Sequence, residues 1–90
     1  MAANVSILNN PIVRSVENVS REEFRTQFVG NIIKFSSFSR IICLGIDTVS
    51  EKEKASLRKD IKGLGIPISD TDEDLNLAVR AIMDRASALR

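Results

Sequence analysis

The sequence predicts an all-α protein, a small bundle of three to four helices with an N-terminal arm. Apolar residues recur every three or four positions along two long segments, which is the spacing of an amphipathic helix. Capping boxes, in which Ser or Thr is followed three positions later by Glu, stand where two of the helices would begin. The apolar run 40–46 could instead form a buried strand, but no second strand-like segment offers it a partner. We therefore expect helices throughout.

The chain is predicted to divide into an arm and one helical domain. Its 90 residues, 43% of them hydrophobic, suffice for a single small core. Residues 1–18 have little periodicity and are assigned to the arm. Asn10 and Pro11 could also open a short helix there, because Pro is favoured in the first turn. Residues 19–90 form the single helical domain.

The first helix of this domain is expected to be long and rich in Phe. It follows the capping box 20–23, and Val19 and Phe24 provide a hydrophobic staple across it. The serines at 36, 37 and 39 lower the helix propensity, so the helix is expected to end, bend or restart before the apolar run 41–44. A break at this point would give the bundle a fourth helix. The apolar face repeats at spacings of four, four and three residues: Phe24, Phe28, Ile32 and Phe35.

Two shorter, capped amphipathic helices are expected to follow. Either of the overlapping capping boxes 48–51 and 50–53 could start the first of them, which carries only a thin line of apolar residues. The two glycines and the proline within 63–67 end it, because glycine permits left-handed backbone and proline restricts the residue before it. The last helix starts near Thr71, with acids in its first turn and arginines later, as the helix dipole favours.

The composition argues against catalysis, cofactors and metals. The net charge is +1, and the chain has no His, Tyr or Trp, so most side chains used for proton transfer and metal binding are missing. The acidic run 70–74 resembles the start of a calcium loop. However, Leu75 and Ala81 stand where such a loop needs Gly and an acidic residue. We expect a non-enzymatic protein that needs no cofactor and no metal.

The cysteine content and the hydropathy predict a cytoplasmic protein without membrane contact. Cys43 lies in the apolar run 41–44 and has no His to activate it, so we expect a buried structural thiol. No segment reaches the about 20 apolar residues of a membrane span. Residues 1–10 carry no charge and no long apolar run, so a secretory signal is not expected.

The leading functional hypothesis is protein–protein contact through the Phe-rich helix. Its apolar face is too wide around 24–35 for two slim partner helices to cover, and exposed apolar patches of that extent mark interfaces. We expect this face to contact a second copy of the chain or another protein. The predicted interface residues are Phe28, Ile32, Phe35, Phe38 and Ile42.

The alternative is a module that binds nucleic acid or an acidic ligand, of a regulatory or viral structural type. Its contacts would be the basic stripe of the second helix: Lys54, Arg58, Lys59 and Lys62. Nucleic acid is not the favoured partner, because acids on the same helix make a solvated face with intrahelical ion pairs the simpler interpretation. A helix-turn-helix is also disfavoured, since the acids of 70–74 would face the DNA groove.

Overall fold

The computed structural model describes residues 10–29 and 32–88. In these residues the chain forms helices and no strand, which confirms the all-α prediction. Five α-helices are present in the described residues, where three or four were predicted, together with a π-helical segment η1 and a 3-10 turn η2. The elements in chain order are α2 (Pro11–Asn18), α3 (Arg21–Phe24), η1 (Arg25–Val29), α4 (Ile32–Leu44), η2 (Ile46–Thr48), α5 (Glu51–Lys62) and α6 (Asp72–Ala88).

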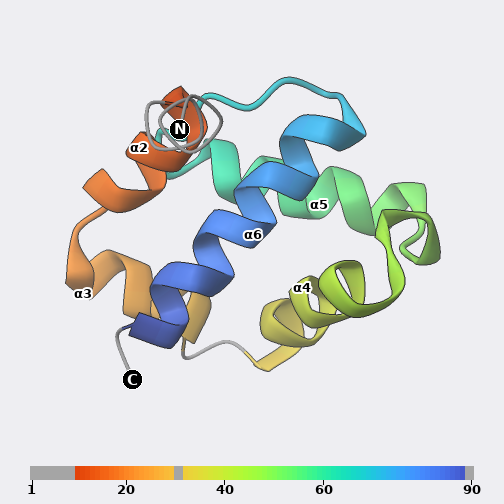
Figure 1. Ribbon diagram of the computed structural model, residues 1–90, viewed down its shortest axis with the longest axis horizontal. Helices are drawn as coiled ribbons and strands as arrows, with labels where there is room; N and C mark the ends of the chain where they lie inside the picture. Colours follow the sequence, from red (N-terminus) through yellow and green to blue (C-terminus); the bar gives the residue numbers. More distant parts are fainter. Residues whose placement is uncertain (1–9, 30–31, 89–90) are drawn as a thin grey trace, which may run out of the picture.

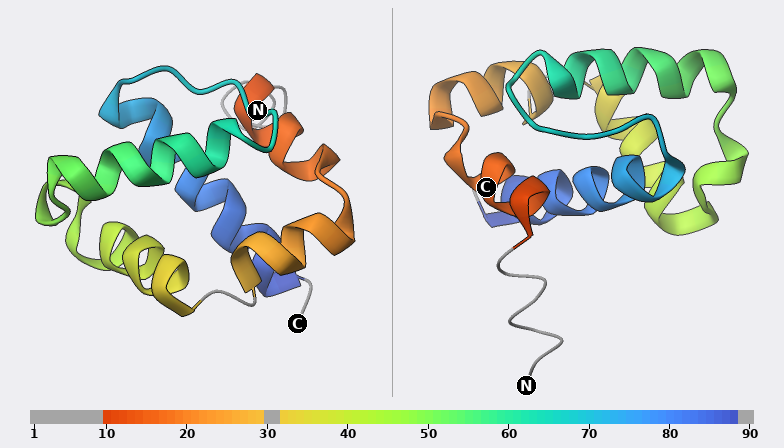
Figure 2. Two further views of the ribbon diagram at one scale, coloured as in Figure 1. Left: turned by 180° about the vertical axis from the view of Figure 1, so that it is seen from behind. Right: turned by 90° about the horizontal axis from the view of Figure 1, so that it is seen from above.

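Helix α6 packs against α2, η1, α4 and α5. It crosses the view of Figure 1 diagonally, with α2 on one side and α4 on the other. Seen from above, α3 and α5 form one layer and α2 and α6 the other, while α4 extends between the two layers (Figure 2). This position has a sequence basis, because α6 carries apolar residues at helical spacing along a whole face. Four of them are completely buried: Leu75, Ala78, Val79 and Ile82.

The N-terminal helix α2 begins at a side-chain cap. The Asn10 side chain accepts a hydrogen bond from the backbone N–H of Ile12 at 2.8 Å, and Pro11 occupies the first helical turn. Ile12 and Val16 are buried and belong to the main core. Of the two readings of residues 1–18, the short helix is therefore present at 11–18, while residues 1–9 lie outside the described residues.

The Phe-rich segment begins as the sequence predicts. The Ser20 hydroxyl accepts from the backbone N–H of Glu23 at 3.2 Å, so Ser20 is the N-cap of α3. Val19 and Phe24, the predicted staple, are both buried. The Phe28 ring then lies 5.3 Å from the Phe24 ring and 5.7 Å from the Phe38 ring, measured between centroids. These three rings lie in the core, within the range of favourable aromatic contacts.

The prediction that the Phe-rich helix ends, bends or restarts near residues 36–39 is wrong, because α4 runs through the serines without interruption. The segment η1 ends at Val29 and α4 begins at Ile32, and residues 30–31 lie outside the described residues. Ser37 is buried and donates a hydrogen bond to the Glu53 carboxylate, so its hydroxyl is satisfied by α5 and does not compete with the helix backbone.

The last two helices begin at the predicted signals, and α5 also ends at one. The Ser50 hydroxyl accepts from the Glu53 N–H at 3.2 Å, so the second of the two overlapping boxes caps α5, and Gly63 is its C-cap. The Thr71 hydroxyl accepts from the Asp74 N–H at 3.2 Å at the start of α6. Gly65, in the connection, has a φ of +85°, which residues with a side chain rarely adopt.

Candidate interaction surfaces

Most of the predicted interface on the Phe-rich segment lies inside the monomer. Phe28 is 1% exposed and Phe38 is 0% exposed, so neither can meet a partner while this fold is intact. Phe35 is half-buried against the core, and the side chain of Ile32 lies outside the described part. The described parts of this segment, η1 and α4, pack against each other and against α6, with the Phe28 and Phe38 rings in contact. This internal packing replaces the external partner that a single helix would need.

The end of α4 is where apolar side chains do reach solvent. Ile42 is 37% exposed and Leu44 is 70% exposed, and Cys43 between them is also exposed. We call Ile42, Cys43 and Leu44 the α4 end patch. The prediction of a buried Cys43 thiol is wrong, because α4 turns Phe38 and Ile41 to the core and so places position 43 on its outer side.

The basic stripe of α5 meets the acids at the start of α6. Lys54 Nζ lies 3.2 Å from Asp72 Oδ2, and Arg58 Nη2 lies 2.9 Å from Asp72 Oδ1. Lys62 Nζ lies 2.9 Å from Asp70 Oδ1. These five residues form what we call the α5–α6 clamp. It connects α5 with the start of α6 through ion pairs whose partners are 8 to 18 residues apart in the sequence.

Of the four cations of the basic stripe, Lys54 differs most from the prediction of a solvated face, because it is buried. Its residue is 4% exposed, and its ammonium also lies 3.0 Å from Glu51, which is the one intrahelical pair along this stripe among the described ion pairs. Hydrogen bonds to Glu51 and then to Asp72 raise the pKa of Lys54 above its ordinary value. Lys54 therefore acts as a positive centre shared by two carboxylates.

The acids of the connection are held in their charged form. The hydrogen bond and the charge of Lys62 lower the pKa of Asp70. The backbone N–H of Ser69 donates to Asp74 Oδ2 at 2.8 Å and, with the Ser69 hydroxyl, lowers the pKa of Asp74. The three aspartates thus point to different donors. This arrangement differs from a calcium site, in which they would converge on one point.

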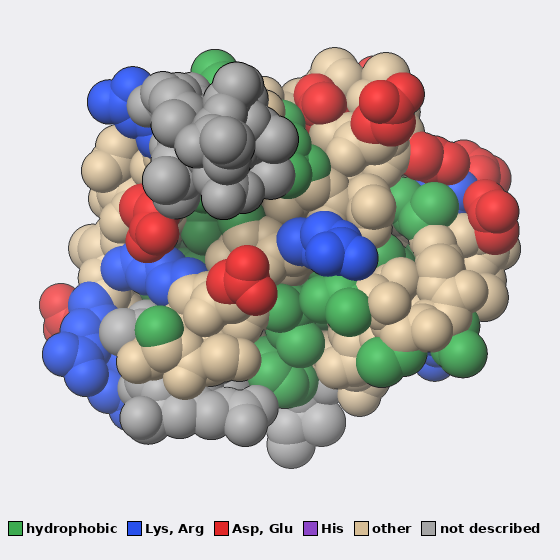
Figure 3. Space-filling view, viewed as in Figure 1, with side chains coloured by type: hydrophobic (Ala, Val, Ile, Leu, Met, Phe, Trp, Pro, Cys, Tyr) green, Lys and Arg blue, Asp and Glu red, His purple; other side chains and the backbone are tan. Residues whose placement is uncertain are grey.

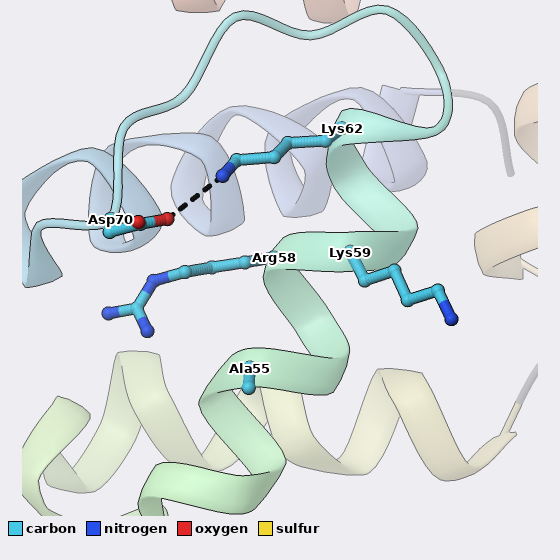
Figure 4. A pocket seen from close by; sticks show the side chains of 5 residues that line it. All are labelled: Ala55, Arg58, Lys59, Lys62 and Asp70. Atoms are coloured by element: carbon cyan, nitrogen blue, oxygen red, sulfur yellow. Dashed lines mark hydrogen bonds and ion pairs between the residues drawn. The ribbon is translucent and has the colours of Figure 1, made fainter.

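A hollow of about 560 Å³ lies beside the clamp, and we call it the α5 hollow. In Figure 4 the side chains of Arg58 and Lys62 extend toward Asp70, whereas Lys59 points the other way. The Nε atom of Arg58 is buried and has no hydrogen-bond partner among the described residues. The residues that line the hollow are Ala55, Arg58, Lys59, Lys62 and Asp70.

A second hollow, of about 430 Å³, lies between α2 and α6. Its apolar lining includes Val13, Leu77 and Ala81, and exposed charged residues of both signs stand beside them. Figure 3 shows hydrophobic side chains at the surface in the middle of this face, with acidic and basic side chains next to them. Arg85 also lines this hollow and binds α2 by donating to the carbonyl oxygens of Val16 and Val19.

Two absences can be stated for the described residues, 10–29 and 32–88. Within them, His, Cys, Asp and Glu side chains form no group of three or more that could hold a metal ion. None of their helices has both the length and the hydropathy to cross a lipid bilayer. No protein-family model, no curated protein and no solved structure matches this chain.

Proposed function

We propose that this chain is a non-enzymatic helical interaction protein that associates with a second copy of itself through the α4 end patch. The observation that carries the proposal is the position of Ile42 and Leu44. They are the large hydrophobic side chains that stay exposed in the described residues, and they lie at the same helix end. Apolar area buried from water contributes about 25 cal/mol per Å², so covering these side chains favours association.

A second copy fits this patch because the surrounding segment is self-complementary in charge. Arg40 precedes the patch and Asp47 follows it, and both residues are exposed. In a two-fold pair the same surface is used by both copies, so antiparallel segments bring Arg40 of each copy toward Asp47 of the other. The internal partner of Arg40 is Glu53, at 3.8 Å, which is a long contact between partly exposed groups and easily exchanged.

The proposed interface keeps one residue of the sequence prediction and adds another. Ile42 was expected at the interface, whereas Leu44 replaces the phenylalanines that lie in the core. The patch is small, so the pair is expected to be weak and to form at high protein concentration. Nucleic-acid binding has less support, because three of the four cations of the basic stripe already face carboxylates.

Light scattering coupled to size-exclusion chromatography tests the proposal, at low and high protein concentration and at low and high salt. The mass should rise from 10.0 kDa toward twice that value as concentration increases, with only a slight loss at high salt, which screens the weak Arg40–Asp47 pairs between copies. Leu44→Glu should keep the mass at that of one chain, because two carboxylates would be buried without partners. Ser56→Glu adds the same negative charge at an exposed position of α5 outside the patch. It is the matched control and should associate like the wild type.

Cys43 gives an independent readout, because it is the single cysteine of the chain and lies in the patch. A short bismaleimide should link two copies through Cys43 at high concentration, and Leu44→Glu should abolish that product. A chain that stays at 10.0 kDa at every concentration, with no covalent dimer, would overturn the proposal.

A further inference from the structure

We propose that the α5 hollow binds the phosphate monoester group of a small molecule between Arg58 and Lys62. This site lies on α5 and shares no residue with the α4 end patch. Phosphate binding and the proposed self-association can therefore be tested independently. The hollow, about 560 Å³, is within the size range of small-molecule sites. Three of its five lining residues are cationic.

Arg58 keeps hydrogen-bonding capacity for such a ligand. Its Nη2 donates to Asp72, but that carboxylate is shared with Lys54. Its Nε–H is buried and makes no hydrogen bond in the described part of the chain, which is unfavourable for a donor. A guanidinium presents its donors in a planar fork that suits two oxygens of one phosphate. A small rotation of this side chain toward the hollow would give the unused donor an acceptor.

Lys62 already holds an anion at the mouth of this hollow. The Asp70 carboxylate accepts from its ammonium at 2.9 Å, and Figure 4 shows both groups on the side toward which Arg58 extends. We infer that Asp70 occupies the place of the ligand's anionic group. Because Asp70 belongs to the same chain, its effective concentration at Lys62 is high. A ligand must therefore carry more negative charge than one carboxylate to displace it.

The charge requirement selects a monoester. A phosphate monoester has a second pKa near 6 and carries nearly two negative charges at neutral pH, whereas a diester carries one. The clamp with Glu51 and Lys59 contains four cations and three carboxylates, which leaves an excess of one positive charge. Lys59, which makes no ion pair with a described residue, carries that excess charge; its side chain points away from Asp70 (Figure 4), so it attracts an anion through space without contacting it.

Chemical-shift titration of the wild-type chain tests the site with two matched probes. Methyl phosphate at about pH 7.5, where the monoester is mainly a dianion, should give saturating shifts at residues 58–62 and 69–70. Dimethyl phosphate and sodium chloride at the same ionic strength should not saturate. Shifts that follow ionic strength alone, or equal affinity for the two phosphates, would overturn the proposal.

Three substitutions separate binding from stability. Lys62→Gln should weaken methyl phosphate binding about tenfold, since a charged hydrogen bond is lost. Asp70→Asn breaks the same internal ion pair but should tighten binding, because it removes the competing carboxylate. Lys52→Gln, at an exposed position of α5 away from the hollow, is the matched control and should bind like the wild type. An unchanged affinity in Lys62→Gln, or weaker binding in Asp70→Asn, would contradict the assignment.

The source of the phosphate is tested by two larger probes. Glucose 6-phosphate represents a small phosphorylated molecule, and a short phosphoserine peptide represents a modified protein. Glucose 6-phosphate should bind at least as tightly as the peptide, because the hollow alone makes the contacts. A peptide that binds about tenfold more tightly, a difference of about 1.4 kcal/mol, would overturn the small-molecule assignment.

Discussion

The guanidinium of Arg85 lies 4.6 Å from the ring centroid of Phe24 and, from the same position, donates to two backbone carbonyls of the chain that precedes α3. Its Nη1 lies 2.7 Å from the Val16 oxygen and 2.6 Å from the Val19 oxygen. These carbonyls stand at the end of α2, where the Val16 oxygen also accepts from the backbone N–H of Val19, the C-cap residue, at 3.4 Å. One side chain of α6 thus fixes both the end of α2 and the ring that starts the Phe core.

Replacing Arg85 should therefore destabilise the whole fold. Arg85→Met keeps much of the side-chain length but removes the cation over the ring and the charged donor, so the free energy of unfolding should fall by about 2–4 kcal/mol. Urea unfolding followed by circular dichroism measures the change. Arg80→Met is the matched control, since Arg80 is exposed on the same helix, and should change the free energy by less than about 0.5 kcal/mol. Equal effects of the two substitutions would contradict this role for Arg85.

Truncation should cost much more stability at Phe28 than at Leu44. Phe28 is 1% exposed and contacts two other rings, so Phe28→Ala should lower the free energy of unfolding by about 3–5 kcal/mol. Leu44→Ala, at a side chain 70% exposed, should change the stability of the monomer by less than about 0.5 kcal/mol.

The two measurements are made at low protein concentration, so that association does not contribute to stability. If Leu44→Ala costs as much as Phe28→Ala, the end of α4 belongs to the core. In that case the α4 end patch would not be available to a partner.

The dependence of stability on pH should have an acid limb and an alkaline limb. The pKa values of Asp70 and Asp74 are lower in the folded chain than the ordinary 3.8. Their contribution is therefore complete above pH 3.8 and is lost as the pH falls through the lowered values. The pKa of Lys54 is raised above 10.5, so its contribution is complete below pH 10.5 and is lost as the pH rises through the raised value.

Urea unfolding midpoints measured across the pH range check this dependence. The chain has no His, so no imidazole titrates between the acid and alkaline limbs. The free energy of unfolding is therefore expected to show a plateau between them. Asp70→Asn should reduce the acid limb without affecting the alkaline one. A steep loss of stability near pH 6, about the ordinary pKa of His, would contradict the assignment of the limbs to these groups.

The features that could be predicted from the sequence are those whose cause is local. Ser20 and Ser50 cap helices because the hydroxyl and the backbone N–H that it accepts from are three residues apart. The same holds for Gly63 at the end of α5 and for the acids at the start of α6. Each of these interactions is complete within one turn, so no knowledge of the tertiary fold is needed.

The features that could not be predicted depend on contacts between distant parts of the chain. Ser37 is compatible with a helix because Glu53, sixteen positions later, accepts from its hydroxyl. Lys54 is buried because Asp72 reaches it from α6. Phe28 is covered by Phe38, a residue that the sequence assigns to the same apolar face. For the same reason the proposed interface, the α4 end patch, differs from the interface that the sequence predicts. Only the fold decides which apolar residues find partners inside the molecule.

The contacts of α6 with α2, η1, α4 and α5 also bear on the order in which the parts of the protein can fold. Val16 accepts a hydrogen bond from Arg85, a residue 69 positions later in the chain, so the first described helix is anchored by the last one. During synthesis η1 and α4 can pack against each other before α6 emerges, but the buried residues of α2 lack their α6 partners until then. Contacts over such a separation slow folding and make it cooperative. The complete core includes buried residues of α6, so it forms only after α6 has been synthesised.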